Sequence, residues 1–180
     1  MKKFFILFLV NFLLFFAVLF SAYSFDVNTP APFFRLKTAD DQEITRDILK
    51  GKVLSVLYET KEVVEKNRPL KNALKNYYQI MPEDMKTRYA RLPVVKCFPV
   101  SWPIIKIWKY KLNENSKKEG ITLYGDWDGK MFADYEMKDN ESNFVIIDSK
   151  GFIRYRAAGK IEDEEIKKIS ELLTNLLKEN

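Results

Sequence analysis

The chain has 180 residues, of which 47% are hydrophobic and 14% aromatic, and this suits one domain with a buried core. It has no histidine and a single cysteine, which excludes histidine acid–base catalysis, Cys/His zinc sites and a disulfide within the chain. The net charge of +5 is too small to indicate binding to nucleic acid.

Residues 1–24 have the pattern of a secretory signal peptide. Lys2 and Lys3 precede an apolar run over residues 4–20, and small residues follow it. Ala22 and Ser24 suit positions −3 and −1 of a cleavage site, so we expect cleavage after Ser24 and a periplasmic protein. The alternative is an inner-membrane anchor, because the apolar segment is long enough to span a bilayer if it stays uncleaved.

The domain is expected to cover residues 33–180, after a stiff linker over residues 25–32 that contains two prolines. A strand is predicted over 33–37, then a polar turn over 38–43 and one helical turn that Gly51 ends. Residues 53–58 are nearly all apolar and β-prone, which is typical of a central strand covered on both faces.

A helix should follow this strand, with a kink at Pro69. Its apolar side is predicted to consist of Val63, Leu70, Ala73, Leu74 and Tyr77. Pro82 should begin a short polar helix over 81–92. Residues 92–98 then predict a second buried strand.

Pro103 should open a third helix, which Gly120 ends before a strand over 121–124 and a tight turn over 125–129. The inward side of this helix is predicted to contain Ile104, Ile107, Trp108, Lys111 and Leu112.

The end of the chain predicts a β-hairpin and a helix. Residues 143–148 and 152–157 flank a short turn that contains Gly151, which indicates an antiparallel pair. The helix should begin at Glu162. Its apolar stripe is predicted to contain Ile166, Ile169, Leu173, Leu176 and Leu177.

Strands that alternate with helices, followed by a hairpin and a helix, predict a three-layer α/β sandwich with a mixed central sheet. The phrases APFFRLKTADDQEI, LKGKVLSVLY, LYGDWDGKMFADY and FVIIDSKGFIRYRAAG, in this order, resemble the thioredoxin-like superfamily in its TlpA/peroxiredoxin branch. The resemblance covers about residues 30–177. Within the superfamily, ETKEVVEKNRPLKNAL is similar to the YtfJ-like periplasmic proteins, in which a comparable stretch replaces the cysteine motif.

The resemblance also implies where a redox site would lie. In the active relatives a strand leads to a cysteine at a helix start, where the helix dipole stabilises the thiolate. Aligned through Thr60, the two cysteine positions of the CxxC motif fall on Glu62 and Glu65, and the peroxiredoxin position falls on Val63. The place of the relatives' cis-proline falls near Ser142, where no proline is available. Dithiol oxidoreductase activity is therefore not expected.

Cys97 lies in the predicted strand over 92–98 and is expected to be a buried, structural thiol. The alternative is a single-cysteine thiol peroxidase or oxidoreductase that uses Cys97, helped by Lys96. Adjacent strand residues face opposite sides, so Lys96 is poorly placed to lower the pKa of the thiol.

Three weaker patterns have both a functional and a structural interpretation. Glu62 and Glu65 could act as a carboxylate pair or could reflect the preference for acids at a helix start. Trp102 and Trp127 could be exposed anchors for a partner or could pack under loops. An acidic cluster could hold calcium, but its spacing departs from the EF-hand pattern, and a solvated turn is expected. The cluster contains Asp126, Asp128, Asp134, Asp139 and Glu141.

Together these patterns predict an exported, redox-inactive thioredoxin-like protein, a binding or accessory protein of the bacterial envelope. Its partner is expected to be another envelope protein, bound at the degenerate active-site edge. No cofactor, metal or nucleic acid is expected, and the membrane is a partner only if the signal segment remains uncleaved. The alternative function is the thiol enzyme based on Cys97.

Overall fold

A computed structural model describes residues 27–179. The predicted signal peptide lies outside these residues. Within them, every helix is too short or too polar to traverse a bilayer.

The described residues form a mixed sheet of seven strands in the order β2-β1-β5-β4-β3-β6-β7. The strands are β1 (Arg35–Lys37), β2 (Glu43–Thr45), β3 (Val53–Glu59), β4 (Tyr89–Lys96), β5 (Tyr124–Asp126), β6 (Asn143–Ile147) and β7 (Ile153–Ala158). The helices are α2 (Arg68–Ile80), α3 (Glu83–Thr87), α4 (Ile104–Glu119), α5 (Lys130–Asp134) and α6 (Asp163–Lys178). β4 is parallel to both β3 and β5, whereas the other pairs are antiparallel.

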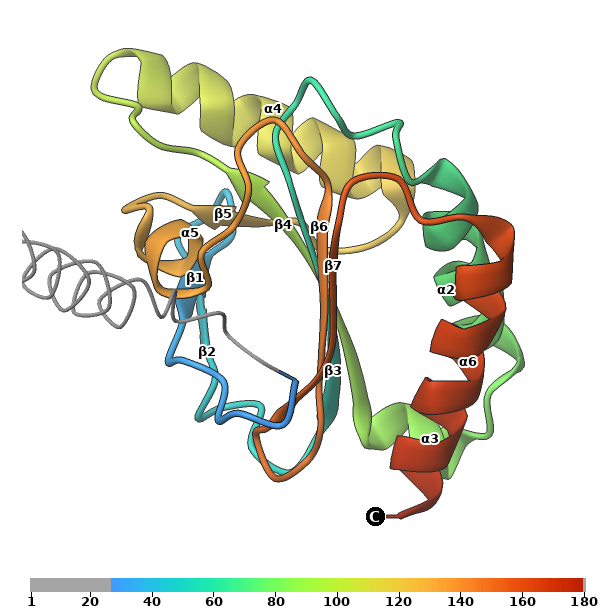
Figure 1. Ribbon diagram of the computed structural model, residues 1–180. Helices are drawn as coiled ribbons and strands as arrows, with labels where there is room; N and C mark the ends of the chain where they lie inside the picture. Colours follow the sequence, from blue (N-terminus) through green and yellow to red (C-terminus); the bar gives the residue numbers. More distant parts are fainter. Residues whose placement is uncertain (1–26, 180) are drawn as a thin grey trace, which may run out of the picture.

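Helices cover both faces of this sheet, which confirms the predicted three-layer mixed α/β class (Figure 1). α2, α3, α4 and α6 lie on one face, and α5 lies on the other with the N-terminal segments. β3 is buried along its whole length, as expected for a central strand. The predicted C-terminal hairpin is present as β6 and β7.

A separate hydrophobic core fills each interface between sheet and helices, because alternate residues of β3 point to opposite faces. Leu54, Val56 and Tyr58 pack toward α5, whereas Val53 and Leu57 pack toward α2 and α6. The predicted apolar stripe of α6 is confirmed, since all of its residues are buried: Ile166, Ile169, Leu173, Leu176 and Leu177. Burial of each such side chain contributes about 1.5–3 kcal/mol.

The start of α2 differs from the prediction. The helix begins at Arg68, and residues 61–67 form turns. Pro69 therefore lies in the first turn and does not kink the helix. A proline is well accommodated there because the first N–H groups of a helix have no partner within the helix.

Three other boundaries also differ. Residues 46–51 form turns and not a helical turn, and β2, which the sequence did not indicate, pairs with β1 through Leu36 and Ile44. α3 ends at Thr87, so residues 89–92 belong to β4. Residues 28–31 hydrogen bond to residues 151–153, and Ala31 joins the core, which fixes this part of the predicted linker to the domain.

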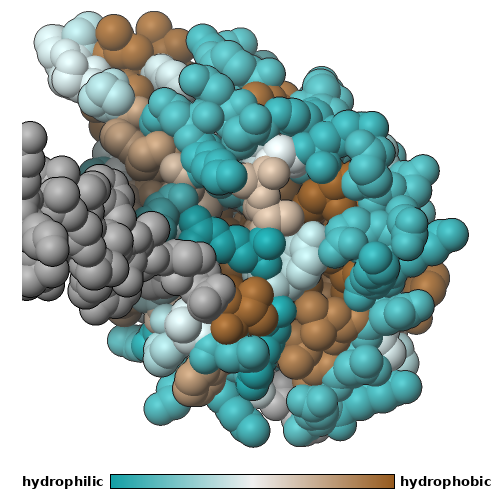
Figure 2. Space-filling view, viewed as in Figure 1, coloured by the Kyte–Doolittle hydropathy of each residue, from teal (hydrophilic) through white to brown (hydrophobic). Residues whose placement is uncertain are grey.

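The predicted inward side of α4 is wrong for the first turns of the helix. Ile104 is 52% exposed and Ile107 61% exposed, and of the predicted set Leu112 is buried. Figure 2 shows hydrophobic surface over the first turns of α4, at the upper left of the view. The apolar spacing identified a helix correctly, but no element of the described chain covers its first turns.

Candidate functional site

One edge of the sheet collects the ends of its central strands. β3 and β4 are parallel, with Glu59 opposite Val95, so their carboxyl ends reach the same edge. β6 is antiparallel to β3 and starts there, with Asn143 opposite Tyr58. Thr60 follows β3 and Ser142 precedes β6, so both residues lie at this edge. In open α/β sheets, ligands bind outside the carboxyl ends of the strands.

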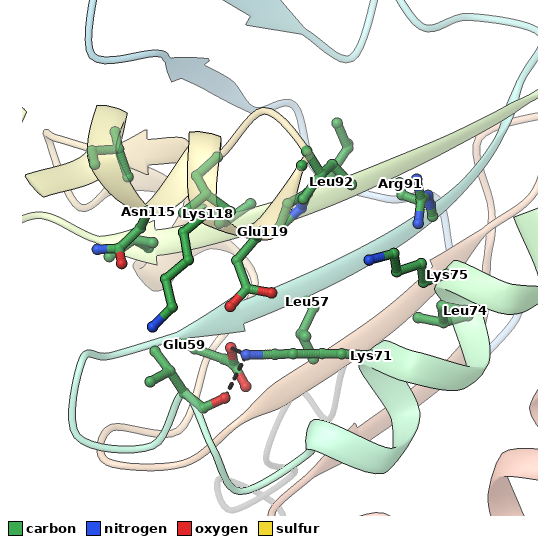
Figure 3. Close-up of a pocket in the computed structure, with 18 of the residues that line it drawn as sticks. Leu57, Glu59, Lys71, Leu74, Lys75, Arg91, Leu92, Asn115, Lys118 and Glu119 are labelled. Atoms are coloured by element: carbon green, nitrogen blue, oxygen red, sulfur yellow. Dashed lines mark hydrogen bonds and ion pairs between the residues drawn. The ribbon is translucent and has the colours of Figure 1, made fainter. Parts of the chain in front are cut away.

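At this edge Glu59 forms a buried polar cluster with Lys71 and Ser142. Glu59 is 5% exposed, although it is charged. Its Oε2 atom lies 2.6 Å from Lys71 Nζ, and the Ser142 hydroxyl donates a hydrogen bond of 2.8 Å to its Oε1 atom. Figure 3 shows Lys71 reaching from α2 to Glu59. Both carboxylate oxygens therefore have a partner, as a buried charge requires.

Burial also sets the acidity of this cluster. It raises the pKa of the Glu59 carboxyl above its ordinary value of 4.5, and the contacts with Lys71 and Ser142 oppose this shift. The charged form of Glu59 thus depends on Lys71, which is the nearest opposite charge.

Glu62 and Glu65, the positions of the missing cysteines, lie in the turns before α2. Both are exposed. They are therefore neither at the first turn of a helix nor on one helix face, which corrects the prediction for this segment. The Thr60 hydroxyl lowers the pKa of Glu62, and Arg68 lowers that of Glu65. A carboxylate pair that shares a proton would show one raised pKa, so this arrangement does not support such a pair.

Ion pairs hold the segment around these glutamates in place. Arg68 binds Glu65 and also lies 2.9 Å from Glu119 at the end of α4. Lys66 pairs with Glu141 in the loop before β6. A network of ion pairs therefore holds this segment to α4 and to the loop before β6.

A pocket of about 790 Å³ opens between α2 and α4 over β3 and β4. Glu59 and Lys71 line this pocket, as do Leu57 of β3 and Leu74 of α2 (Figure 3). Lys118 and Glu119 line it from α4. The buried cluster is thus reached from the face of the sheet that α2 and α4 cover.

Cys97 lies at the same edge, where its polar neighbours are Tyr58 and Asp126. It follows β4 directly, outside the strand, and is 1% exposed. Burial raises the pKa of the thiol to about 12, and the nearby Asp126 contributes to this shift. Lys96 Nζ lies 2.7 Å from Asp139 and 4.5 Å from the Phe132 ring centroid. Its charge is thus engaged elsewhere, and these surroundings do not favour a reactive thiolate.

The residues of the predicted acidic cluster have separate protein partners. Asp126 is buried and accepts hydrogen bonds from the Tyr58 hydroxyl and the Phe132 N–H, both at 2.9 Å, so it is not part of a solvated turn. Asp139 pairs with Lys96, and Asp134 lies 3.0 Å from Lys130. Within residues 27–179, no three acidic or cysteine side chains are grouped as metal ligands would be.

The two tryptophans differ in exposure. Trp102 is 75% exposed in the loop after β4, at the same edge as Thr60. Trp127 is half-buried and donates a hydrogen bond from Nε1 to the Lys37 carbonyl at 3.2 Å. Of the two, Trp102 is therefore the one that a partner could contact.

Sequence reasoning missed Glu59 and Lys71. The available signal was one charged residue directly after the apolar run over 53–58, where nearly every other side chain is hydrophobic. The signal for Lys71 is weaker. It lies one turn before Leu74 on α2, and the sequence predicts a start of this helix before Arg68.

Comparison with known proteins bears on the fold. No protein-family model matches the chain, and no curated protein does. Among solved structures, a candidate protein disulfide isomerase from Bacteroides thetaiotaomicron superimposes with a TM-score of 0.66 at 22% identity, over 85% of this chain and 91% of that one. The chain has the thioredoxin-like fold.

Two further structures agree with this assignment. The thioredoxin domain of a thiol-disulfide oxidoreductase from Bacteroides vulgatus gives a TM-score of 0.59 at 14% identity, over 82% of this chain and 98% of that one. An exposed lipoprotein thioredoxin from Streptococcus pneumoniae gives 0.53 at 19% identity, over 78% and 99%. At such identities the thioredoxin-like likeness concerns the fold, so the chemistry of this chain has to be argued from its own residues.

Proposed function

We propose that this chain is an exported, redox-inactive thioredoxin-like protein that serves as a binding or accessory protein of the bacterial envelope. The observation that carries the proposal is the cluster of Glu59, Lys71 and Ser142 at the edge where the resemblance puts thiol chemistry. A carboxylate and an ammonium group can bind and orient a partner but cannot exchange disulfides.

The state of Cys97 supports the same proposal. It is the only cysteine of the chain, so a dithiol site cannot form within it. The Cys97 side chain is buried near Tyr58 and Asp126. Glu59 follows Tyr58 in β3, so its side chain points to the opposite face of the sheet, where it lines the pocket. The likeness of residues 59–74 to the YtfJ-like proteins, which also lack the cysteine motif, is part of this proposal.

Export is proposed from the sequence of residues 1–24. One structural neighbour is an exposed lipoprotein, which is consistent with a fold used at the cell surface. N-terminal sequencing of the protein from the envelope fraction should give a chain that begins at Phe25. An intact Met1 in a tightly membrane-bound protein would contradict cleavage and favour the anchor.

The partner surface that we propose is the edge around Thr60 and Trp102, together with the exposed first turns of α4. Trp102 is at the rim, and hydrophobic side chains next to it are open to solvent. These are Ile104, Ile107 and Tyr110. Exposed apolar patches mark interaction sites, and tryptophan is enriched among residues that dominate binding energy.

Capture of envelope proteins on the purified protein tests this surface. Trp102→Glu should reduce recovery of the specific partner by about tenfold, because a charge would replace an aromatic anchor. Ile80→Glu is the matched control: Ile80 is 82% exposed but lies at the far end of α2. Equal recovery by the wild type and the Trp102 variant would remove the edge from the proposal.

A further inference from the structure

The pocket between α2 and α4 has an apolar interior. Its floor is formed by β3 and β4, through side chains such as Leu57 and Pro93, and Leu74 and Leu112 contribute from the two helices. Its volume of about 790 Å³ lies in the range of pockets that enclose small organic ligands, about 300–1,000 Å³. The interior therefore suits the hydrocarbon part of a ligand.

The charges around this interior are unbalanced. Three acidic residues line the pocket, and each is already paired: Glu59 with Lys71, and both Glu65 and Glu119 with Arg68. Seven basic residues line it: Lys61, Arg68, Lys71, Lys75, Arg91, Lys111 and Lys118. The lining thus has an excess of positive charge, which favours an anionic ligand.

Three of these cations are available to such a ligand. None of the ion pairs within residues 27–179 includes Lys75, Arg91 or Lys118. Arg91 lies over the ring of Tyr78, with Cζ 4.3 Å from the ring centroid, and Lys75 lies one turn before Tyr78 on α2. Figure 3 shows Lys75 and Arg91 at one end of the pocket and Lys118 at the other.

We propose that this pocket binds a single-chain amphiphile with an anionic head group, a carboxylate or a phosphate. The head group lies between Lys75 and Arg91, where it offsets the repulsion between two cations. The hydrocarbon chain lies on the apolar floor near Leu57 and Leu74. This site goes beyond the proposed partner surface, which consists of the rim around Thr60 and Trp102 and the exposed first turns of α4; of those α4 residues, Ile107 also lines the pocket.

Binding of dodecanoate, below the concentration at which it forms micelles, tests the proposal by calorimetry on the purified protein. Dodecyltrimethylammonium supplies the same chain with the opposite charge, and acetate supplies the carboxylate without the chain. Dodecanoate should bind saturably at one site. The cationic amphiphile and acetate should each bind at least about tenfold more weakly, because each lacks one half of the recognition.

Charge reversal locates the head group. Lys75→Glu, alone and with Arg91→Glu, should weaken dodecanoate binding by about tenfold or more, and Lys75→Arg should bind within about twofold of the wild type. Reversal of Lys106 and Lys117, exposed on α4 outside the pocket, makes the same change in net charge as the double variant and should have little effect. Because Lys75 is exposed, the single variant should remain folded.

Equal binding of both amphiphiles, or equal weakening by the control pair, would overturn the proposal. The proposal would also be overturned if an acidic peptide with apolar residues bound to the pocket and dodecanoate did not. These measurements need no partner protein and no export, so their failure is distinct from failure of the proposed envelope role.

Discussion

Lys71→Met should lower the free energy of unfolding by about 3 kcal/mol, because it leaves the carboxylate of Glu59 buried without its opposite charge. The substitution also removes the hydrogen bond from Lys71 to the carbonyl of Val64 in the turn before α2. The methionine side chain keeps most of the volume of the lysine, so packing is largely preserved. Urea unfolding of the variant and the wild type measures the difference.

A double-mutant cycle separates the ion pair from other effects. Glu59→Gln removes the buried charge while its amide can still accept a hydrogen bond from Ser142. In the double variant, Lys71→Met no longer leaves a carboxylate unpaired, so much of the lost stability should return. Strictly additive effects in the double variant would mean that Glu59 and Lys71 do not depend on each other.

The stability of the Lys71→Met variant, relative to the wild type, should depend on pH. Burial raises the pKa of folded Glu59 above 4.5, and removal of Lys71 takes away an interaction that opposes this rise. An acid with a raised folded-state pKa destabilises the fold most above that pKa, and the penalty disappears as the pH falls toward the unfolded value. The stability difference from the wild type should therefore be largest at neutral pH and should narrow as the pH approaches 4.5.

Native Cys97 should react with iodoacetamide at pH 7 at least about a hundredfold more slowly than an exposed thiol. Two features of the structure cause this: the side chain is 1% exposed, and burial raises the pKa of the thiol to about 12. Alkylation then requires a local opening of the fold, and little thiolate is present even after opening. Mass spectrometry of the alkylated protein over time gives the rate.

The matched control carries the thiol on the surface. In the variant with Cys97→Ser and Asn76→Cys, the cysteine is on an exposed position of α2 and should react at the rate of a model thiol. Cys97→Ser alone should cost about 1 kcal/mol of stability, because it places a more polar hydroxyl in a buried site. Rapid labelling of native Cys97, at the rate of the surface control, would support the thiol enzyme instead.

The elements that the sequence predicted well are those with one dominant period. β3 is apolar throughout, and the last helix has an uninterrupted stripe from Ile166 to Leu177, so burial and sequence pattern coincide. α4 has a similar spacing at its start, but Ile104 and Ile107 are exposed. Spacing identifies which residues share a helix face, and it does not tell whether another element covers that face.

Thr60 and Ser142 lie at one edge of the sheet, and the chemistry of that edge was only partly predictable. Thr60 and Ser142 could be located from the sequence because each lies next to the end of a predicted strand. The contact between Glu59 and Lys71 depends on where α2 begins. The apolar Val63 suits the helical pattern and predicts an earlier start, whereas the helix begins at Arg68. An ion pair between a strand end and a helix depends on this register, and one sequence does not supply it.

The most direct test of the central claim is to repeat the partner capture with the Cys97→Ser protein, alongside Trp102→Glu. We predict that the serine variant retains the same envelope partner in the same amount, with or without a reducing agent, and that the Trp102 variant loses it. Loss of the partner in the serine variant, with retention in the Trp102 variant, would contradict a binding protein that acts without thiol chemistry.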